Sequence, residues 1–203
     1  MKHVGLGLVA VLLAAASADA GTLSIVDVHA PAVNCVFHLL CKVSVVDTVS
    51  DLPLPGLVGQ ARLQSRTLTG AVGTLGAGRT IYLYRVDLGQ ASGSVDCLAG
   101  LVVNFGPVTK LPYAHGADAE VFVITSGGLG TIGLKSAEQD GDVITFEFKE
   151  LVCAGSAPGQ GASTLFFGLA ASTSPMMVGS SVFGVGSPPI VPVSARVPIH
   201  RIR

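Results

Sequence analysis

The chain has 203 residues and a formal net charge of −1, and only 12% of its residues are charged, about half the usual fraction. A formal net charge of −1 by itself gives no electrostatic case for binding nucleic acid or an anionic membrane. Glycine is abundant, with 26 residues, and tryptophan is absent, a composition that favours strands and turns over helices. A weakly charged surface also favours association near the isoelectric point, so self-association is expected.

Residues 1–20 have the organisation of a secretory signal peptide. Lys2 and His3 precede an apolar and glycine run over Val4–Ala16, and Ala18-Asp19-Ala20 supplies the small-x-small pattern that signal peptidase requires. The run is too short to span a bilayer stably. We therefore expect cleavage near Ala20, export to the periplasm, the cell surface or the medium, and no transmembrane segment in the mature chain.

The four cysteines all follow the predicted signal peptide and fit an oxidising compartment. Sequence alone permits three pairings. The favoured one joins Cys35 to Cys41, which closes a small loop, and Cys97 to Cys153, which connects distant strands. A zinc site is not favoured, because no CxxC is present and the histidines are scattered.

The first half of the mature chain predicts five strands joined by irregular segments. The strands cover Thr22–Val28, Cys41–Ser50, Leu57–Thr69, Thr80–Leu88 and Cys97–Phe105. His29–Leu40, between the first two, is expected to be a loop or a short helical turn. Thr80–Leu88 is the clearest strand, because its period of two separates the face of Tyr82 and Tyr84 from the face of Arg85 and Asp87.

The second half predicts four further strands and three irregular segments. The strands cover Ala119–Thr125, Asp142–Cys153, Ser163–Ala171 and Met176–Val185. Asp142–Cys153 stands out, because three large apolar side chains alternate with polar ones directly after the turn signal Asp140-Gly141. Gly106–Asp118 and Ala154–Ala162 are expected to be loops, and Leu129–Gln139 to be irregular.

About nine or ten short strands without a convincing amphipathic helix predict an all-β protein, a single antiparallel two-sheet β-sandwich of Greek-key, immunoglobulin-like or jelly-roll type. We expect this domain to span 21–187. Residues 188–203, with four prolines and three arginines, are expected to form a tail or an edge strand.

Several stretches of the mature chain carry a resemblance to known proteins. They are NCVFHLLC (34–41), ARLQSRTLTG (61–70), YLYRVDL (82–88), VVNFGPV (102–108), VFVITSGGLG (121–130) and VCAGSAPGQG (152–161). Together they resemble a group of secreted bacterial β-sandwich proteins, some of which end in a PEP-CTERM-type sorting tail. The resemblance implies secretion and a sandwich. It does not extend to anchoring, because this chain lacks Pro-Glu-Pro and a terminal apolar helix.

No motif predicts catalysis or a cofactor. The nucleophile elbow G-x-S-x-G is absent, and no pair of acids is singled out for glycoside hydrolysis. Two groups of acids lie near turns, namely Glu138, Asp140 and Asp142, and Asp118 and Glu120 near His115. Each offers fewer oxygen ligands than calcium needs. We therefore expect no catalytic residue, no metal and no cofactor.

The leading prediction is a non-catalytic secreted or cell-surface module with a structural or interaction role. Its partner would be a protein, a matrix or a glycan, bound through Gly106–Asp118 or Ala154–Ala162. Two alternatives are a carbohydrate-binding or adhesion module and a secreted hydrolase. Candidate ligand-binding residues are Tyr82 and Tyr84, which would stack on sugar rings, and Tyr113 and His115 in the first loop.

Overall fold

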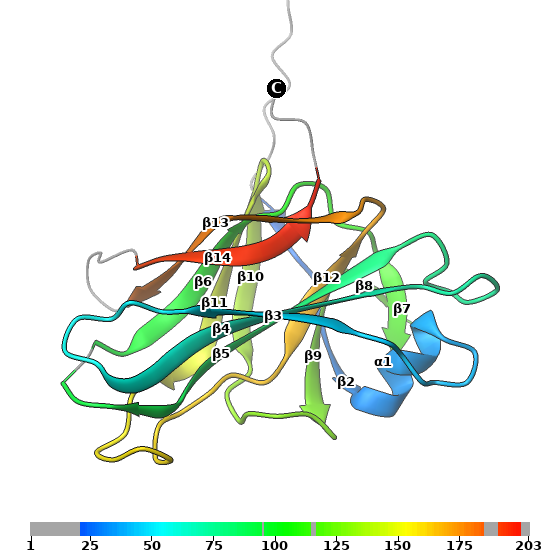
Figure 1. Cartoon of the computed structure of the whole chain (residues 1–203). Helices are drawn as coiled ribbons and strands as arrows, with labels where there is room; N and C mark the ends of the chain where they lie inside the picture. The colour runs from blue at the N-terminus through cyan, green and yellow to red at the C-terminus, as the bar shows by residue number, and fades with distance from the viewer. Residues whose placement is uncertain (1–20, 95, 115–116, 185–190, 200–203) are drawn as a thin grey trace, which may run out of the picture.

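The computed structural model describes residues 21–94, 96–114, 117–184 and 191–199, so the predicted signal peptide lies outside the described part. Within these ranges the chain is an all-β sandwich, as predicted. It consists of two six-stranded sheets, a two-stranded hairpin and one short helix (Figure 1).

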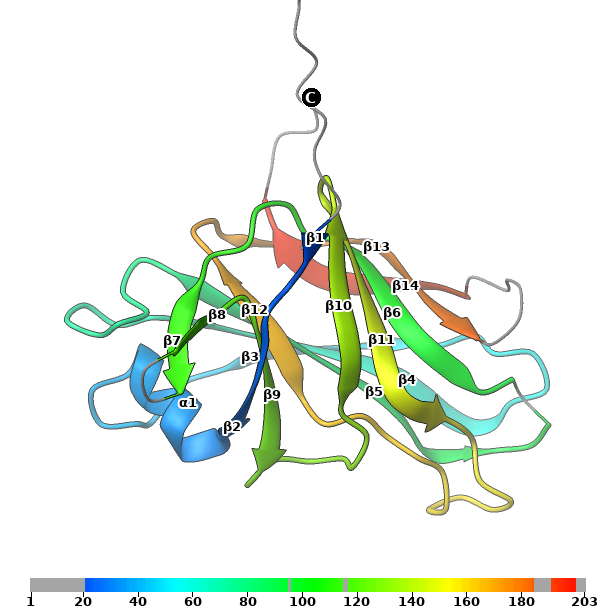
Figure 2. The same ribbon diagram turned by 180° about the vertical axis from the view of Figure 1, so that it is seen from behind.

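Sheet A contains the strand that follows the Asp140-Gly141 signal. Its order is β1 (Gly21–Thr22), β10 (Leu134–Asp140), β11 (Val143–Val152), β6 (Leu98–Asn104), β13 (Pro175–Gly184) and β14 (Val191–Pro198). Figure 2 shows this sheet from behind, with β1 beside β10. Asp140 pairs with Val143, so the turn residues are Gly141 and Asp142, and Gly141 has the positive φ of +58° that such a tight hairpin requires.

Sheet B contains the strand of the two adjacent tyrosines. Its order is β2 (Ile25–His29), β9 (Val121–Ser126), β12 (Phe167–Ala171), β5 (Thr80–Ser92), β4 (Val58–Thr69) and β3 (Val46–Asp51). All its neighbours are antiparallel except β2 and β9, which run parallel with Val26 opposite Phe122. The sandwich is therefore antiparallel, as predicted, with this one parallel pair inside sheet B.

The main core lies between the two sheets. Sheet B contributes Tyr82, Tyr84 and Phe167, and sheet A contributes Leu101 and Phe146, all fully buried. The rings of Phe146 and Phe167 meet with centroids 4.9 Å apart across the interface. The period of two in β5 thus places its tyrosine face in the core.

A second apolar layer covers the outer face of sheet B. It consists of α1 (Ala30–Phe37) and the hairpin of β7 (Leu111–Ala114) and β8 (Ala117–Ala119). Val33, Val36 and Phe37 are buried in this layer, at the i, i+3 and i+4 spacing of one helix face. Pro31 stands in the first turn, where its missing N–H costs no hydrogen bond.

Two disulfides join Cys35 to Cys41 and Cys97 to Cys153, the pairing favoured from the sequence. The first closes the loop after α1. The second ties the segment before β6 to the segment after β11, and these two strands are neighbours in sheet A. The described part contains no free cysteine.

Fourteen strands are present in the described ranges, more than the nine or ten expected. Leu129–Gln139, expected to be irregular, contains most of β10, which forms because the tight turn aligns it with β11. The expected loop Gly106–Asp118 contains β7 and part of β8. In the C-terminal segment, Val191–Pro198 is the edge strand β14, and 188–190 and 200–203 lie outside the described residues.

Candidate functional site

The tyrosines predicted to bind ligands lie in the protein interior. The exposed fractions of Tyr82, Tyr84 and Tyr113 are 0%, 0% and 1%. Tyr82 Oη donates to the carbonyl of Thr173 at 2.7 Å, and Tyr113 packs against the Phe122 ring with centroids 4.6 Å apart. The face of Tyr82 and Tyr84, predicted to stack on sugar rings, is therefore buried, and the loop candidate Tyr113 is buried as well. His115 lies outside the described residues.

The two loops predicted to bind a partner are largely used by the fold itself. Ala154–Ala162 folds back on β5, where Leu88 N donates to the carbonyl of Ala162 at 3.0 Å and Gly159 N donates to that of Gly89 at 2.8 Å. An added Cβ at Gly161 would lie 1.9 Å from the Leu88 carbonyl oxygen. The backbone of the loop therefore lies in direct contact with the backbone of β5 at this point. Most of Gly106–Asp118 that is described belongs to the hairpin beside α1.

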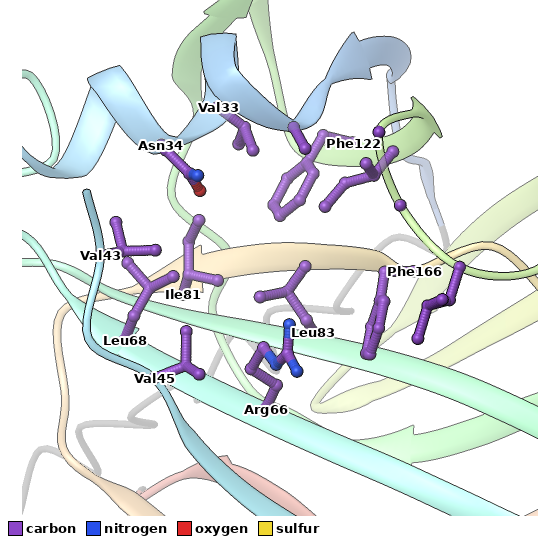
Figure 3. A pocket seen from close by; sticks show the side chains of 15 residues that line it. Val33, Asn34, Val43, Val45, Arg66, Leu68, Ile81, Leu83, Phe122 and Phe166 are labelled. Atoms are coloured by element: carbon purple, nitrogen blue, oxygen red, sulfur yellow. The ribbon is translucent and has the colours of Figure 1, made fainter. Parts of the chain in front are cut away.

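The structure instead places a pocket of about 370 Å³ between α1 and the outer face of sheet B. Figure 3 shows side chains entering this space from the helix on one side and from the strands on the other. The lining residues are Ala30, Val33, Asn34, Val43, Val45, Arg66, Leu68, Ile81, Leu83, Phe122, Ile124, Gly127, Gly128, Leu129 and Phe166. The lining is thus apolar except for two side chains, those of Asn34 and Arg66, as in sites for small organic ligands.

Arg66 is held in a fixed position at the pocket. Its Nε donates to Asp47 Oδ1 at 2.6 Å and its Nη2 donates to Oδ2 at 2.8 Å, a bidentate pair. The guanidinium carbon lies 4.7 Å from the ring centroid of Phe166. The hydrogen bond from Arg66 holds the pKa of Asp47 below its ordinary value and raises the pKa of Arg66. Both groups are therefore charged near neutral pH, and their charges balance.

Two side chains that line the pocket retain hydrogen-bond donors without a partner among the described residues. Within the described residues, Arg66 Nη1 makes no hydrogen bond, and neither does the side-chain amide of Asn34. Asn34 extends from α1 toward the strands (Figure 3). The site therefore presents hydrogen-bond donors in an apolar surrounding, and the cation that lines it, Arg66, is paired with Asp47.

A shallower depression lies over the outer face of sheet A and includes Glu147 and Glu150. Glu147 Oε2 accepts a hydrogen bond from Lys135 Nζ at 2.9 Å, which lowers the pKa of Glu147. A glycosidase acid needs the opposite, a raised pKa. Within the described part of the chain, no group of three or more His, Cys, Asp or Glu is arranged to hold a metal ion.

Asp118 and Glu120, the other acids singled out from the sequence, do not line the pocket. Glu120 pairs with Lys110 Nζ at 2.8 Å and accepts a hydrogen bond of the same length from Ser24 N. This contact holds the start of β9 beside the segment that joins β1 to β2.

In the described ranges, no helix has the length and hydropathy needed to cross a bilayer.

One signal in the sequence bears on this site. Residues 81–84 are four consecutive apolar residues, a run typical of a strand covered on both faces. Ile81 and Leu83 lie on the face opposite the tyrosines and line the pocket.

Comparison with protein-family models, with curated protein sequences and with solved structures found no match for this chain.

Proposed function

We propose that this protein is a non-catalytic, secreted or cell-surface β-sandwich that acts as an interaction module, and that its binding site is the pocket beneath α1. The observation that carries the proposal is the apolar pocket of about 370 Å³ with a fixed guanidinium at its wall. The volume is within the range of about 300–1,000 Å³ typical of sites for small molecules. The predicted signal peptide and the disulfides support an extracellular setting.

The ligand class follows from the charge balance at Arg66. A carboxylate entering the pocket would lose its hydration and would meet a cation that Asp47 already neutralises. A neutral carbonyl or ester oxygen loses less hydration and accepts the same N–H bond. The favoured ligand is therefore a small, neutral, apolar molecule with one or two hydrogen-bond acceptors.

The two alternative functions have less support. A glycan-binding site of the predicted kind needs exposed rings, and the three tyrosines are buried. Hydrolysis by paired acids needs carboxylates at a cleft, and the residues lining this pocket include no Asp or Glu.

The first test asks whether the pocket binds apolar molecules. The neutral fluorescent dye Nile red should bind saturably to the exported protein. Val45→Trp, which places a large ring in the pocket, should abolish that binding. Val49→Trp is the matched control, because Val49 lies on β3 outside the pocket and is exposed. Absence of saturable binding, or equal loss in both variants, would refute the proposed site.

The second test asks whether Arg66 selects the acceptor. In competition with the dye, methyl octanoate should bind about fivefold more tightly than octane, because one hydrogen bond contributes about 1 kcal/mol. The charged octanoate should bind less tightly than the ester. Arg66→Met should remove the advantage of the ester. Arg62→Met is the control, because Arg62 is on the same strand, faces Asp51 and does not line the pocket.

A further inference from the structure

A second feature of the molecule lies beside the pocket, at the end of the sandwich where α1 is found. Two segments, 38–42 after α1 and 70–79 between β4 and β5, form what we call the apolar tip. Its four large apolar side chains have exposed fractions of 69% for Leu39, 73% for Leu40, 93% for Val72 and 65% for Leu75. Figure 1 shows both segments at this end of the molecule. Such a concentration of exposed apolar side chains marks an interaction surface.

The two segments are fastened to each other through the end of α1. Ala71 N donates to the carbonyl of Phe37 at 2.8 Å, and Gly76 N donates to that of Val36 at 2.7 Å. An added Cβ at Gly76 would lie 2.3 Å from the Phe37 ring, so the loop lies directly on the helix. The Cys35–Cys41 disulfide closes the other segment. The fold therefore holds the apolar side chains outward on a fixed backbone.

The chain segments that form the tip, with their flanks, carry charge of one sign. Residues 30–46 and 67–86, which include both segments and their flanks, contain no Asp or Glu. They contain three cationic residues, of which Lys42 and Arg79 belong to the two tip segments themselves. The overall net charge of −1 conceals this local excess, because it sums over the whole chain.

The size and shape of the tip favour a bilayer over a protein as its partner. Four side chains on two projecting loops cover on the order of a few hundred Å². A stable protein–protein interface buries about 800 Å² on each partner. A lipid interface has no such minimum, because it receives individual apolar side chains and attracts flanking cations to anionic headgroups.

We propose that the apolar tip docks the protein on the surface of a bilayer that contains anionic lipid. The four apolar side chains enter the interface, and Lys42 and Arg79 face the headgroups. Val43 and Val45, in the chain directly after the tip, line the pocket. Docking would therefore bring the pocket close to the bilayer. The docking itself does not depend on whether the pocket binds a ligand.

The test uses the absence of tryptophan from the chain. Single variants Leu39→Trp and Val72→Trp of the exported protein each report on one position of the tip. With vesicles of phosphatidylcholine and phosphatidylglycerol, both should show a blue-shifted emission and quenching by brominated lipid. Val58→Trp is the control, because Val58 is 61% exposed but lies at the opposite end of β4. No shift at the tip, or an equal shift at Val58, would overturn the proposal.

A second arm measures affinity by vesicle co-sedimentation. Leu39→Ser with Leu40→Ser should weaken binding at least tenfold, since each apolar side chain withdrawn from water contributes about a factor of ten. Lys42→Gln with Arg79→Gln should reduce the preference for anionic vesicles by about fivefold for each cation. Lys149→Gln, an exposed cation on the outer face of sheet A, should have no comparable effect. Equal binding to vesicles with and without phosphatidylglycerol would refute the role of the cations.

Discussion

The hydroxyl of Tyr84 donates a hydrogen bond of 2.6 Å to the backbone carbonyl of Arg196, and so connects the middle of sheet B to the edge strand β14 of sheet A. The side chain of Arg196 makes a second connection, because its Nε donates to Thr48 Oγ1 on β3 at 2.5 Å. The two sheets are therefore joined by polar contacts at the edge where β3 and β14 both end their sheets.

Tyr84→Phe should destabilise the protein by about 1 kcal/mol, because a buried hydrogen bond is lost while the ring continues to fill the core. The measurement is chemical denaturation followed by circular dichroism, with an unchanged m value as the sign that only stability has changed. A variant as stable as the original would contradict the importance of this contact.

Tyr113→Phe is expected to act in the opposite direction. The Tyr113 hydroxyl is buried and has no hydrogen-bond partner among the described residues. Removing it relieves an unsatisfied polar group, whereas the ring contacts to Phe37 and Phe122 persist. The free energy of unfolding should stay the same or rise by about 1 kcal/mol. A loss as large as that of Tyr84→Phe would show that this hydroxyl has a partner.

The two disulfides should differ in their contribution to stability. The chain separation is 56 residues for Cys97–Cys153 and 6 for Cys35–Cys41. In the chain-entropy model these loops correspond to about 4 and about 2 kcal/mol. Replacing both Cys97 and Cys153 by Ala should therefore lower the melting temperature by several degrees more than replacing Cys35 and Cys41. Equal losses in the two double variants would contradict this order.

Alkaline pH should unfold the protein. Burial raises the pKa of all three tyrosines, Tyr82, Tyr84 and Tyr113, above their ordinary value. The folded state thus retains protons that the unfolded state releases above about pH 10. Their contribution to stability is fully present below that pH and is lost above it, by about 1.4 kcal/mol per pH unit for each tyrosine.

The measurement for this effect is a titration of tyrosinate absorbance, to which no tryptophan contributes. Absorbance should rise together with the loss of circular dichroism, in one cooperative step. The same chain in denaturant should titrate near pH 10. A gradual native titration near pH 10 with the fold intact would contradict burial of these hydroxyls.

The elements predicted best from the sequence are those in which apolar and polar side chains alternate regularly. In β11, Ile144, Phe146 and Phe148 are all buried, as their period of two indicated. Strand β10 has no such signal, because Lys135, Glu138 and Gln139 give it a polar composition. Its conformation comes from pairing with β11, which is a tertiary effect that a local pattern does not contain.

The pocket was beyond local prediction for a related reason. Its wall combines α1 with strands that are distant in the chain, such as Leu68 on β4 and Phe166 next to β12. The period of two places Ile81 and Leu83 on the face opposite the tyrosines. It does not identify the element that packs over that face. The tyrosines, in contrast, were misassigned because alternation identifies a common face without showing whether it meets solvent or a second sheet.

The parallel pairing of β2 with β9 has a consequence for how this protein is made. Val26 of β2 pairs with Phe122 of β9, which lies almost a hundred residues later in the chain. Because synthesis proceeds from the N-terminus, β2 therefore emerges long before the strand with which it pairs. Until β9 is made, the backbone amides of β2 are free to pair with other chains, so we expect the nascent chain to need a holding chaperone during that interval.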